Sequence, residues 1–457
     1  MDISTYLVPG KRAHLAGIGG VSMCPLAEVL HSMGLAVQGS DMSENANVRH
    51  LRSLGIDVAV GHAADNLGES DFVIRTAAIH DDSPEISGAI ARGIPVFERA
   101  QAWGAIMKGY KNALCIAGTH GKTTTTSMAT HIFMAAQKDP TVMIGGTLEL
   151  LHSGYRVGKG DTIIAESCEY CNSFLSFFPT VAVILNVEAD HLDFFKDLTD
   201  IEHSFRRFAE LVPIGGNVVA NKDDAGVRET LSGASQPIFW FSLNDPAAHC
   251  HASNLEWKNG LPSFDIVVRG SHYAHVSLQV GGEHNVMNAL AAASAAYLLG
   301  IDGNAVGLGL ATFRGAGRRF ERKGAFRGAE VYDDYAHHPG ELHALLTMAK
   351  TLGYQRIVCA FQPHTYTRTK ALFDEFVEEL KLPDVVVLAE IYAARETNDI
   401  GISSQDLCAK IPGAIYCSTL DKVTSALAEV AQSGDLILTV GAGDIYKAGE
   451  KLVKEGA

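Results

Sequence analysis

Short apolar runs alternate with helix-like patterns along the first hundred residues of the chain. The runs fall at 13–20, 35–41, 71–79 and 94–100. Between them, apolar residues recur at helical spacing, for example over residues 22–33 and 47–54. Strand-like runs that alternate with helical patterns are typical of a parallel sheet with crossover helices. The pattern therefore predicts an α/β fold for this region.

A second series of the same kind begins at residue 113. Its further strand-like runs lie at 161–167, 180–191 and 216–224. Residues 238–280 instead show shorter runs, which favour antiparallel strands. A third series begins near residue 331 and contains strand-like runs at 355–363, 384–392 and 435–444. Three series predict three α/β domains, with limits near residues 105 and 315.

The composition of the 457 residues narrows the class of protein. Hydrophobic residues make up 47% and charged residues 19%, which provides ample material for cores and excludes a disordered chain. The formal net charge of −15 is the reverse of the basic footprint of a nucleic-acid binder. Any anionic ligand must therefore be bound at local sites made of backbone N–H groups, Lys, Arg and metal ions. We expect no nucleic-acid partner.

Neither a membrane segment nor a cysteine framework is apparent. The longest uncharged apolar run, residues 289–301, is too short to cross a bilayer, and the first residues lack a signal-peptide pattern. We expect a cytoplasmic protein without a membrane partner. Of the eight cysteines only Cys168 and Cys171 form a close pair, which is weak evidence for zinc. We expect reduced thiols and no zinc.

A glycine loop between an apolar run and a helical pattern is the most informative motif. It contains Gly118, Thr119, His120, Gly121, Lys122 and Thr123. Backbone N–H groups of such a loop can face a polyphosphate, the lysine adds a full charge, and the threonine offers a hydroxyl to Mg²⁺. The usual spacing would require glycine at Ile116, so the loop is a shortened form. It predicts a site for nucleotide phosphates.

Two candidate metal ligands follow neighbouring strand-like runs. Glu166 ends one run, and His191 lies just past the next. Both are expected at the carboxyl ends of strands in the sheet that carries the phosphate loop, where open α/β sheets bind ligands. Together with Thr123 they predict a magnesium site, although either residue alone could equally cap a strand or lie on the surface.

A second glycine turn follows the first strand-like run. Gly17, Gly19 and Gly20 match a dinucleotide-binding pattern only in part, because Ser22 replaces its last glycine. Asp41 ends the next run, where an acid can hold a ribose hydroxyl. The turn alone permits NAD, another nucleotide or a merely tight bend. An NAD-dependent oxidoreductase is therefore an alternative, but it has no need of a second loop with magnesium ligands.

Several motifs together resemble the Mur ligase family. GTHGKT, the Glu166 strand end, NVEADHLD, GEHNVMNALAA, GAGRRFE, DDYAHHPGE and FQPHTYTRTK occur in the order typical of that family, over nearly the whole chain. The resemblance implies a Rossmann-like domain for a UDP-sugar at 1–105, a P-loop ATPase-like domain for ATP at 106–315, and a Rossmann-like domain for an amino acid at 316–457.

The resemblance also implies an activity. It is the ATP-dependent joining of L-alanine to the carboxylate of UDP-N-acetylmuramate, through an acyl phosphate, in peptidoglycan precursor synthesis. ATP and two Mg²⁺ ions would be required, and a monomer or weak homodimer is expected. The alternative within the family is a murein peptide ligase, which adds a preformed tripeptide to the same UDP-sugar. A non-catalytic nucleotide-binding regulator is a further alternative, which the intact phosphate and magnesium residues disfavour.

Residue roles carried over from the family fall into four groups. The UDP-sugar would meet Gly17, Gly19, Gly20, Asp41 and His62. Magnesium would meet Thr123, Glu166 and His191. ATP would meet residues 118–124, which include Thr124, and also His284, Asn285, Asn288, Arg319 and Asp334. The amino acid would meet Tyr335, His337, His364 and Arg368. Lys122, His191, Arg319 and His337 would be catalytic, with His337 as the base for the amine.

The chain departs from the family at two positions. Thr365 stands where many relatives have arginine after the FQPH histidine, which removes a positive charge near the expected amino-acid carboxylate. Cys168 stands where many relatives have an acid. From the residues alone, His337 to Pro339 could simply end a strand and begin a helix. Arg368 and Lys370 could equally form a solvated helix face.

Overall fold

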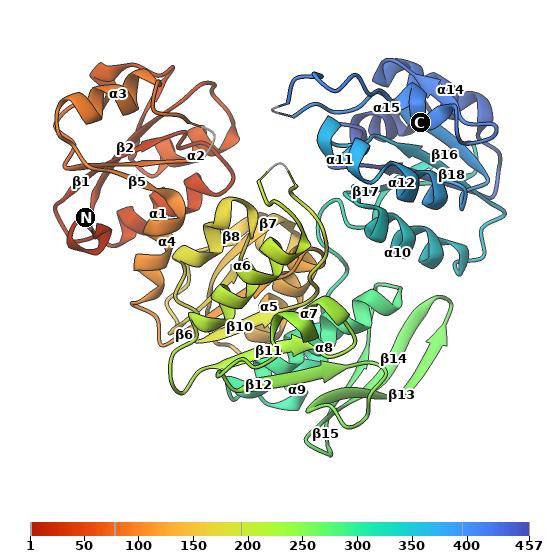
Figure 1. Ribbon diagram of the computed structural model, residues 1–457, viewed down its shortest axis with the longest axis horizontal. Coiled ribbons are helices and arrows are strands. Elements are labelled where there is room, and N and C mark those ends of the chain that lie inside the picture. Colours follow the sequence, from red (N-terminus) through yellow and green to blue (C-terminus); the bar gives the residue numbers. More distant parts are fainter. Residues whose placement is uncertain (1, 77–78, 193, 395, 457) are drawn as a thin grey trace. The chain divides into compact units, whose positions relative to one another are not determined.

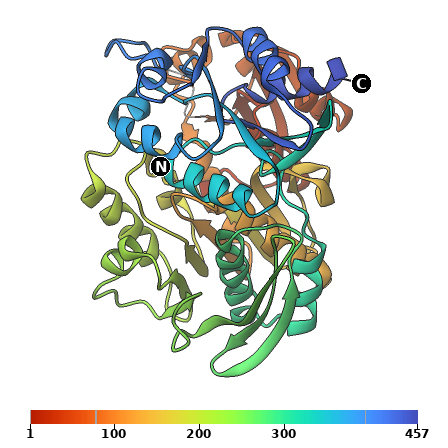
Figure 2. The ribbon, with the colours of Figure 1, turned by 90° about the vertical axis from the view of Figure 1, so that its right-hand side faces the viewer.

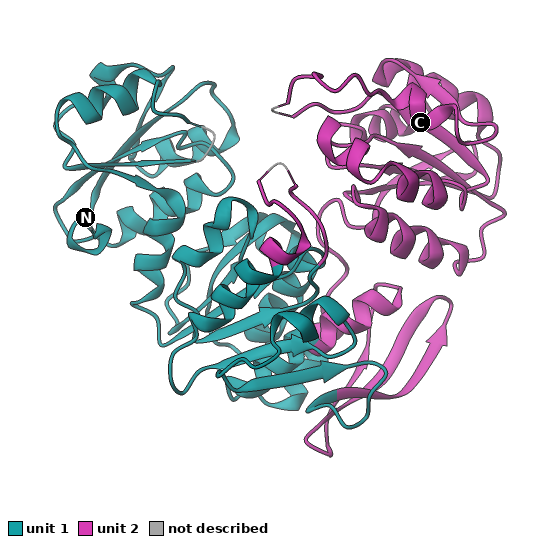
Figure 3. Ribbon diagram, viewed as in Figure 1, with its two compact units in different colours: residues 1–187, 202–250, 291–309 teal, residues 188–201, 251–290, 310–457 magenta. Residues whose placement is uncertain are grey.

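The computed structural model describes residues 2–76, 79–192, 194–394 and 396–456. They form three β-sheets with flanking helices, the predicted α/β class (Figure 1). By their contacts they divide into two compact units (Figure 3). Unit 1 comprises residues 1–187, 202–250 and 291–309, and unit 2 comprises residues 188–201, 251–290 and 310–457.

The N-terminal sheet of unit 1 has the strand order β3-β2-β1-β4-β5, with parallel neighbours throughout. Its strands are β1 (Arg12–Ala16), β2 (Ala36–Asp41), β3 (Asp57–Val60), β4 (Phe72–Arg75) and β5 (Val96–Glu98). Its helices are α1 (Met23–Ser32), α2 (Ala46–Ser53), α3 (Pro84–Ala91) and α4 (Arg99–Met107). This is the predicted Rossmann-like arrangement, whose order reverses beside β1.

Two predicted strands are shorter than the apolar runs that indicated them. The run at 94–100 forms β5 only to Glu98, because Glu98 caps α4 in a capping box with Gln101 and the chain turns helical at Arg99. The run at 71–79 forms β4 only to Arg75. Residues 77–78 of that run lie outside the described residues.

The second sheet of unit 1 has the order β12-β11-β10-β6-β9-β7-β8. Its strands are β6 (Asn112–Ala117), β7 (Thr141–Leu148), β8 (Ser153–Arg156), β9 (Thr162–Glu166), β10 (Val181–Ile184), β11 (Asn217–Asn221) and β12 (Ile238–Ser242). β8 is antiparallel to β7, whereas β6 runs parallel to both β9 and β10. The carboxyl ends of β6, β9 and β10 therefore share one edge of the sheet. Three helices lie between these strands in the chain: α5 (Lys122–Ala135) after β6, α6 (Leu198–Glu210) after β10 and α7 (Ala225–Thr230) after β11.

Three strands of seven to nine residues and two helices follow β12 in the chain. They are β13 (Cys250–Lys258), β14 (Leu261–Val268) and β15 (Ser271–Ser277), followed by α8 (Glu283–Leu298) and α9 (Gly303–Thr312). β14 and β15 are antiparallel, as predicted for this region, but β12, at the start of the predicted range 238–280, is parallel to β11, so the prediction was wrong for that strand. The apolar run at 289–301 forms most of α8, and its alanines are buried. Among the described residues no helix combines the length and apolar character that crossing a bilayer requires.

The C-terminal sheet lies in unit 2 with the order β16-β17-β21-β18-β19-β20. The strands are β16 (Glu321–Phe326), β17 (Ala329–Asp334), β18 (Arg356–Phe361), β19 (Val385–Ala389), β20 (Ile415–Cys417) and β21 (Asp435–Val440). The helices are α10 (Pro339–Lys350), α11 (Tyr366–Ala371), α12 (Phe373–Glu379), α13 (Ser404–Cys408), α14 (Leu420–Val430) and α15 (Tyr446–Gly456).

Alternation along the central strands gives this sheet a core on each face. In β18, Cys359 and Phe361 pack with α10 and α12, whereas Val358 and Ala360 pack with α14 and α15. The helices of the first core are cyan and blue in Figures 1 and 2, and α14 and α15 are dark blue. A parallel strand that is covered on both faces has apolar residues at successive positions. This is why the sequence shows continuous apolar runs here.

Candidate nucleotide and amino-acid sites

The phosphate loop joins β6 to α5 in unit 1. Gly118 has φ +150°, and a Cβ there would lie 2.9 Å from the Cβ of Leu185, so no larger side chain fits without a shift. Gly121 has φ +81° at the helix cap, where glycine is favoured. Asn186 fixes the loop: its Oδ1 accepts from the His120 N–H at 2.7 Å, and its Nδ2 donates to the His120 carbonyl at 3.2 Å. Sequence reasoning missed Asn186, although an asparagine directly after a buried strand was the available signal.

Lys122 is held at the start of α5 by a buried acid. Its Nζ lies 3.0 and 3.1 Å from the two carboxylate oxygens of Glu169 and donates to the Thr119 carbonyl at 3.1 Å. Burial alone would lower the pKa of Lys122, but the Glu169 charge outweighs it and raises that pKa. Lys122 therefore carries a full positive charge where nucleotide phosphates are expected. Sequence reasoning missed Glu169, an acid three positions past Glu166.

Two oxygen-bearing side chains predicted to hold magnesium lie together beside this loop. The Thr123 hydroxyl donates to Glu166 Oε1 at 3.1 Å, and the Gly145 N–H donates to Glu166 Oε2 at 2.7 Å. A hydroxyl and a carboxylate are hard oxygen donors of the kind that Mg²⁺ prefers, so these residues fit the ion. Thr124 follows on the first turn of α5 and is partly exposed.

His191, the third predicted metal ligand, belongs to unit 2. Its backbone has φ +52°, which is uncommon for a residue other than glycine. Its N–H donates to Asp190 Oδ1 at 2.7 Å, and its Nε2 lies 3.8 Å from Asp190 Oδ2. Asp190 therefore holds the turn that presents His191.

The N-terminal glycine turn is closed by its own acid. The Gly19 N–H donates to Asp41 Oδ2 at 2.9 Å, and the Gly20 N–H donates to the Gly17 carbonyl at 3.1 Å. A Cβ at Gly19 would lie 2.7 Å from Val48 Cγ2, so this position requires glycine. Asp41 stabilises the turn, and its contact with the UDP-sugar stays a prediction.

His62, predicted near the uridine, belongs to a buried polar network. Its Nδ1 lies 3.1 Å from Glu85 Oε2 and 2.9 Å from the Ser40 hydroxyl. Glu85 is fully buried and also accepts from Asn66 Nδ2 at 2.7 Å. Burial would raise the pKa of Glu85, but hydrogen bonds from His14, Ser40 and Asn66 lower it to about 2. The carboxylate thus stays ionised and anchors His62.

The residues predicted for adenine lie at the start of α8 in unit 2. Asn285 Nδ2 donates to the Gly281 carbonyl at 2.7 Å, and Asn288 Nδ2 donates to Asn285 Oδ1 at 3.3 Å. His284 adjoins them on the exposed side of the helix. The two amides are therefore mutually oriented at the beginning of the helix.

Arg319 and Asp334 lie at the C-terminal sheet. Arg319 Nη1 is 3.8 Å from a Glu341 oxygen, and the guanidinium lies 5.1 Å from the centre of the Tyr335 ring. Asp334 accepts from the backbone N–H groups of Phe320 at 2.7 Å and Ala336 at 2.8 Å. Burial raises the pKa of Asp334 to about 6, although the Arg319 charge opposes this. Asp334 therefore links the backbone at Phe320 to the segment that carries Tyr335 and His337.

The structure brings the four predicted amino-acid residues together. The Tyr335 and His337 ring centres are 5.4 Å apart, and those of His337 and His364 are 5.9 Å apart. Arg368 Nη1 donates to His364 Nδ1 at 3.2 Å. Arg368 also pairs with Asp190, an acid that sequence reasoning did not place in this site. Its signal was its position in the NVEADH motif.

The two adjacent histidines before α10 have opposite hydrogen-bonding patterns. His337 Nδ1 faces the Tyr335 carbonyl at 2.9 Å and must donate, which leaves its Nε2 as an acceptor. His338 Nδ1 accepts from the Gly340 N–H at 3.3 Å, so its Nε2 donates to the Ala189 carbonyl at 3.2 Å. Burial lowers the pKa of His337 to about 4. Of the two, only His337 retains a neutral ring nitrogen that can take a proton.

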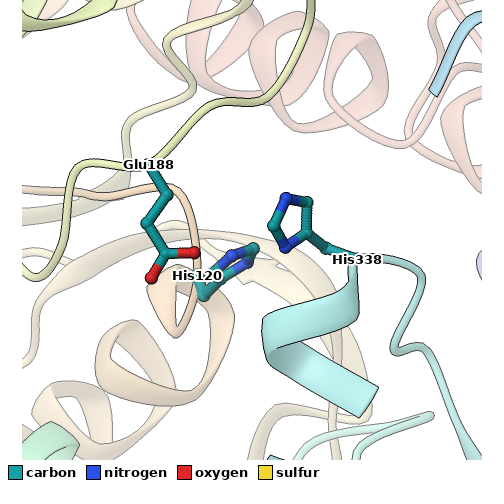
Figure 4. A group of neighbouring side chains, drawn as sticks. All are labelled: His120, Glu188 and His338. Carbon is teal, nitrogen blue, oxygen red and sulfur yellow. The ribbon is translucent and has the colours of Figure 1, made fainter. Parts of the chain in front are cut away.

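His338 and Glu188 lie close together within unit 2. Figure 4 shows His338 at the start of α10 and Glu188 on the segment that follows β10. A carboxylate oxygen of Glu188 lies within 4.8 Å of a ring nitrogen of His338. The figure also labels His120, which belongs to the phosphate loop of unit 1.

A three-domain α/β protein with a phosphate loop and a cluster of histidine and arginine side chains belongs to the class that binds nucleotide phosphates. Three family models match this chain: "Mur ligase family, catalytic domain" at residues 12–111, "Mur ligase middle domain" at 116–296 and "Mur ligase, glutamate ligase domain" at 318–443. The chain belongs to the Mur ligase family.

Relatives and solved structures agree with this membership. The UDP-N-acetylmuramate–L-alanine ligase of Caldanaerobacter subterraneus is 43% identical over 97% of this chain and 98% of its own length. The enzyme of that name from Lachnospira eligens is 46% identical over 96% and 97%. The crystal structure of a UDP-N-acetylmuramate-alanine ligase from Thermotoga maritima has TM-score 0.79 and 30% identity, covering 97% of this chain and 98% of that one.

A murein peptide ligase from Psychrobacter arcticus shares the fold as well. Its TM-score is 0.74 at 24% identity, over 97% of this chain and 98% of that one. At this level of identity the likeness concerns the fold alone. Membership of the Mur ligase family disfavours the oxidoreductase alternative.

Proposed function

We propose that this chain is an ATP-dependent ligase that joins L-alanine to the carboxylate of UDP-N-acetylmuramate, a step in peptidoglycan precursor synthesis. The observation that carries the proposal is the phosphate loop, where Lys122 donates to the Gly118 carbonyl and the Thr123 hydroxyl donates to Glu166. Full-length similarity of 43–46% to enzymes named for this reaction supports the choice of substrates. A cytoplasmic location and a monomer or weak homodimer remain expectations.

The proposal assigns one ligand to each predicted domain. Residues 1–105 would bind the UDP-sugar, 106–315 ATP, and 316–457 the amino acid. The family models match segments that begin and end near these limits, at 12–111, 116–296 and 318–443. The assignment is supported by the glycine turn in the first segment, the phosphate loop in the second and the Tyr335–Arg368 cluster in the third.

The first chemical step would be transfer of the γ-phosphoryl group to the sugar carboxylate. A carboxylate is a poor target for an amine, and conversion to an acyl phosphate provides a leaving group. Such transfers depend on positioning and charge neutralisation more than on covalent help. Lys122, and Arg319 as its proposed partner, would supply positive charge to the phosphates. Mg²⁺, held by Thr123, Glu166 and His191, would neutralise further charge when bound.

The second step would be attack of the amine on the acyl phosphate, with loss of phosphate. The amine must lose a proton, and His337 Nε2 is the proposed acceptor because its Nδ1 is committed to the Tyr335 carbonyl. His338 is excluded from this role in the described arrangement, since its Nε2 donates to Ala189. The proton would reside on His337 until solvent or phosphate removes it.

A single assay separates the two ligase alternatives. Phosphate release would be measured with ATP and UDP-N-acetylmuramate, and with L-alanine, glycine, L-serine or the tripeptide as acceptor. We expect L-alanine to give the highest kcat/KM. One methyl group in an apolar pocket contributes about 1–3 kcal/mol, so glycine should be disfavoured roughly 10- to 200-fold.

The same assay contains the outcomes that contradict the proposal. A higher kcat/KM for the tripeptide than for L-alanine would place the chain with the murein peptide ligases. Phosphate release that is independent of any amino acid would indicate an ATPase without ligation. Omission of UDP-N-acetylmuramate is the matched control, because without its carboxylate no acyl phosphate forms.

A further inference from the structure

A pocket of about 140 Å³ opens in unit 1 between the N-terminal glycine turn and the end of β9. Ser22, Arg99, Trp103 and Glu166 are among its lining residues. Ser22 lies two positions past the last glycine of the turn, and Glu166 is one of the proposed metal ligands. The pocket thus lies between the two predicted phosphate-binding elements. Neither the sequence motifs nor the family resemblance singled out Arg99 or Trp103.

Arg99 is a half-buried cation without an acidic partner among the residues that the structure describes. It is the first residue of α4, and its Nη1 donates to the Ser22 hydroxyl. Burial lowers the pKa of Arg99, which indicates that its charge is poorly solvated. A desolvated charge is costly unless an opposite charge offsets it. An anionic ligand in this pocket would provide that charge.

Ser22 is positioned to bind the same anion. It is the N-cap of α1, yet its side chain makes no capping hydrogen bond. The Trp103 Nε1 donates to the Ser22 carbonyl at 3.5 Å, which fixes the segment. Because the Ser22 oxygen accepts from Arg99, its own proton is available to a phosphate oxygen. Arg99 and Ser22 can therefore donate side by side.

The glycine turn itself provides no positive side chain. Gly17, Gly19 and Gly20 offer only backbone groups, and the Gly19 N–H is already bound by the Asp41 carboxylate. A diphosphate at this turn would meet a negative charge from Asp41 with nothing to offset it. Arg99, which donates to the Ser22 hydroxyl, can supply a positive charge beside the turn.

We propose that Arg99, together with Ser22, binds the diphosphate of the UDP-sugar and is a positioning residue for that substrate. This inference rests on the proposed function and adds to it the group that recognises the diphosphate. The muramyl carboxylate is the other anion of the substrate. Arg99 is assigned to the diphosphate because it donates to Ser22, which follows the glycine turn where the diphosphate is expected.

The test is equilibrium binding to the full-length chain. UDP-N-acetylmuramate and UDP-N-acetylglucosamine, which lacks the muramyl carboxylate, would be titrated into wild type, Arg99→Ala and Arg99→Lys. Charge-assisted hydrogen bonds contribute about 1.5–3 kcal/mol, so Arg99→Ala should weaken both ligands to the same extent, roughly 10- to 150-fold. Arg99→Lys should recover part of the affinity. Arg92→Ala, an exposed arginine outside the pocket, should leave both affinities unchanged.

Three results would overturn the inference. Weakening of UDP-N-acetylmuramate alone would assign Arg99 to the carboxylate. Unchanged affinity of both ligands, in a variant that melts and binds ATP like wild type, would remove Arg99 from the site. If Arg99→Ala is poorly folded, the titrations are compared between wild type and Arg99→Lys. If Arg99→Lys binds each UDP-sugar as tightly as wild type does, that result counts against the inference. Failure of wild type to bind either UDP-sugar would instead refute the proposed function.

Discussion

Arg368 donates from both Nε and Nη2, at 2.9 and 2.8 Å, to one carboxylate oxygen of Asp190, a residue 178 positions earlier in the chain. Both side chains are less than a tenth exposed. Burial would raise the pKa of Asp190, but the Arg368 charge lowers it below the usual value. Arg368 is one of the residues predicted to contact the amino acid. Its pairing with Asp190 fixes the orientation of the guanidinium.

Asp190→Asn should destabilise the protein and impair the amino-acid site. Removing one partner of a buried pair costs about 3 kcal/mol or more, because the other charge is left uncompensated. We expect a melting temperature lower by roughly 6–12 °C. We also expect a KM for L-alanine that rises more than that for ATP. Asp374→Asn, at an exposed acid of α12, is the control that should change neither quantity.

The Arg368–Asp190 pair also predicts how the stability of the fold depends on pH and how substitutions at the two residues combine. The folded pKa of Asp190 is lowered, so the pair stabilises the fold at pH values above the usual carboxyl range and is lost as pH falls below it. Arg368→Ala should likewise raise the KM for L-alanine. The double variant should be no less stable than Asp190→Asn alone, because it leaves no uncompensated charge at this pair. Fully additive effects on the melting temperature would contradict the pairing.

Lys122→Ala should abolish most turnover. The change removes a charge that balances the developing phosphate charge, and losses of such groups reduce kcat by about 10²–10³ or more. It also removes the buried ion pair between Lys122 and Glu169, so stability should fall as well. The double variant Lys122→Ala with Glu169→Gln should regain stability but not activity. Calorimetry and phosphate release together check both parts, and near-normal turnover of the single variant would refute the role of the loop.

Metal dependence separates the magnesium site from the cysteine pair. Glu166→Gln should lower kcat and raise the Mg²⁺ concentration needed for half-maximal rate, because it removes a charged oxygen ligand. Cys168→Ser with Cys171→Ser should keep both quantities near wild type. Elemental analysis of the purified protein should find no zinc. One zinc per chain, lost in the double cysteine variant, would revive the metal role that the sequence made improbable.

The acid side of the pH profile should report on His337. Burial lowers the pKa of His337 to about 4, so the neutral base is present above about pH 5 and is lost as pH falls through about 4. The rate of amide formation should therefore stay level down to about pH 5, without a fall near the ordinary histidine value of 6.5. His337→Asn should reduce kcat roughly 10²- to 10⁴-fold. His338→Asn, at the capping histidine, should chiefly lower stability.

Local sequence patterns were sufficient for the elements and for the phosphate loop. The alternation of apolar runs with helical patterns predicted the sheets, since period and burial follow from backbone geometry. GTHGKT specified its own turn, because only glycine tolerates the backbone at Gly118 and Gly121. The strand at 94–100 was predicted too long, because the capping box at Glu98 overrode the apolar run.

The partners of the charged side chains were decided by the tertiary structure alone. Nothing in the sequence near Lys122 identifies Glu169 as its counter-ion, and nothing near Arg368 indicates Asp190. Arg99 was unremarkable in sequence until packing placed it beside Ser22. The sequence determined which residues carry charge and where the chain must turn. Which charges meet depends on how distant segments pack, because electrostatic and hydrogen-bond energies depend on the distances between atoms that only the folded chain brings together.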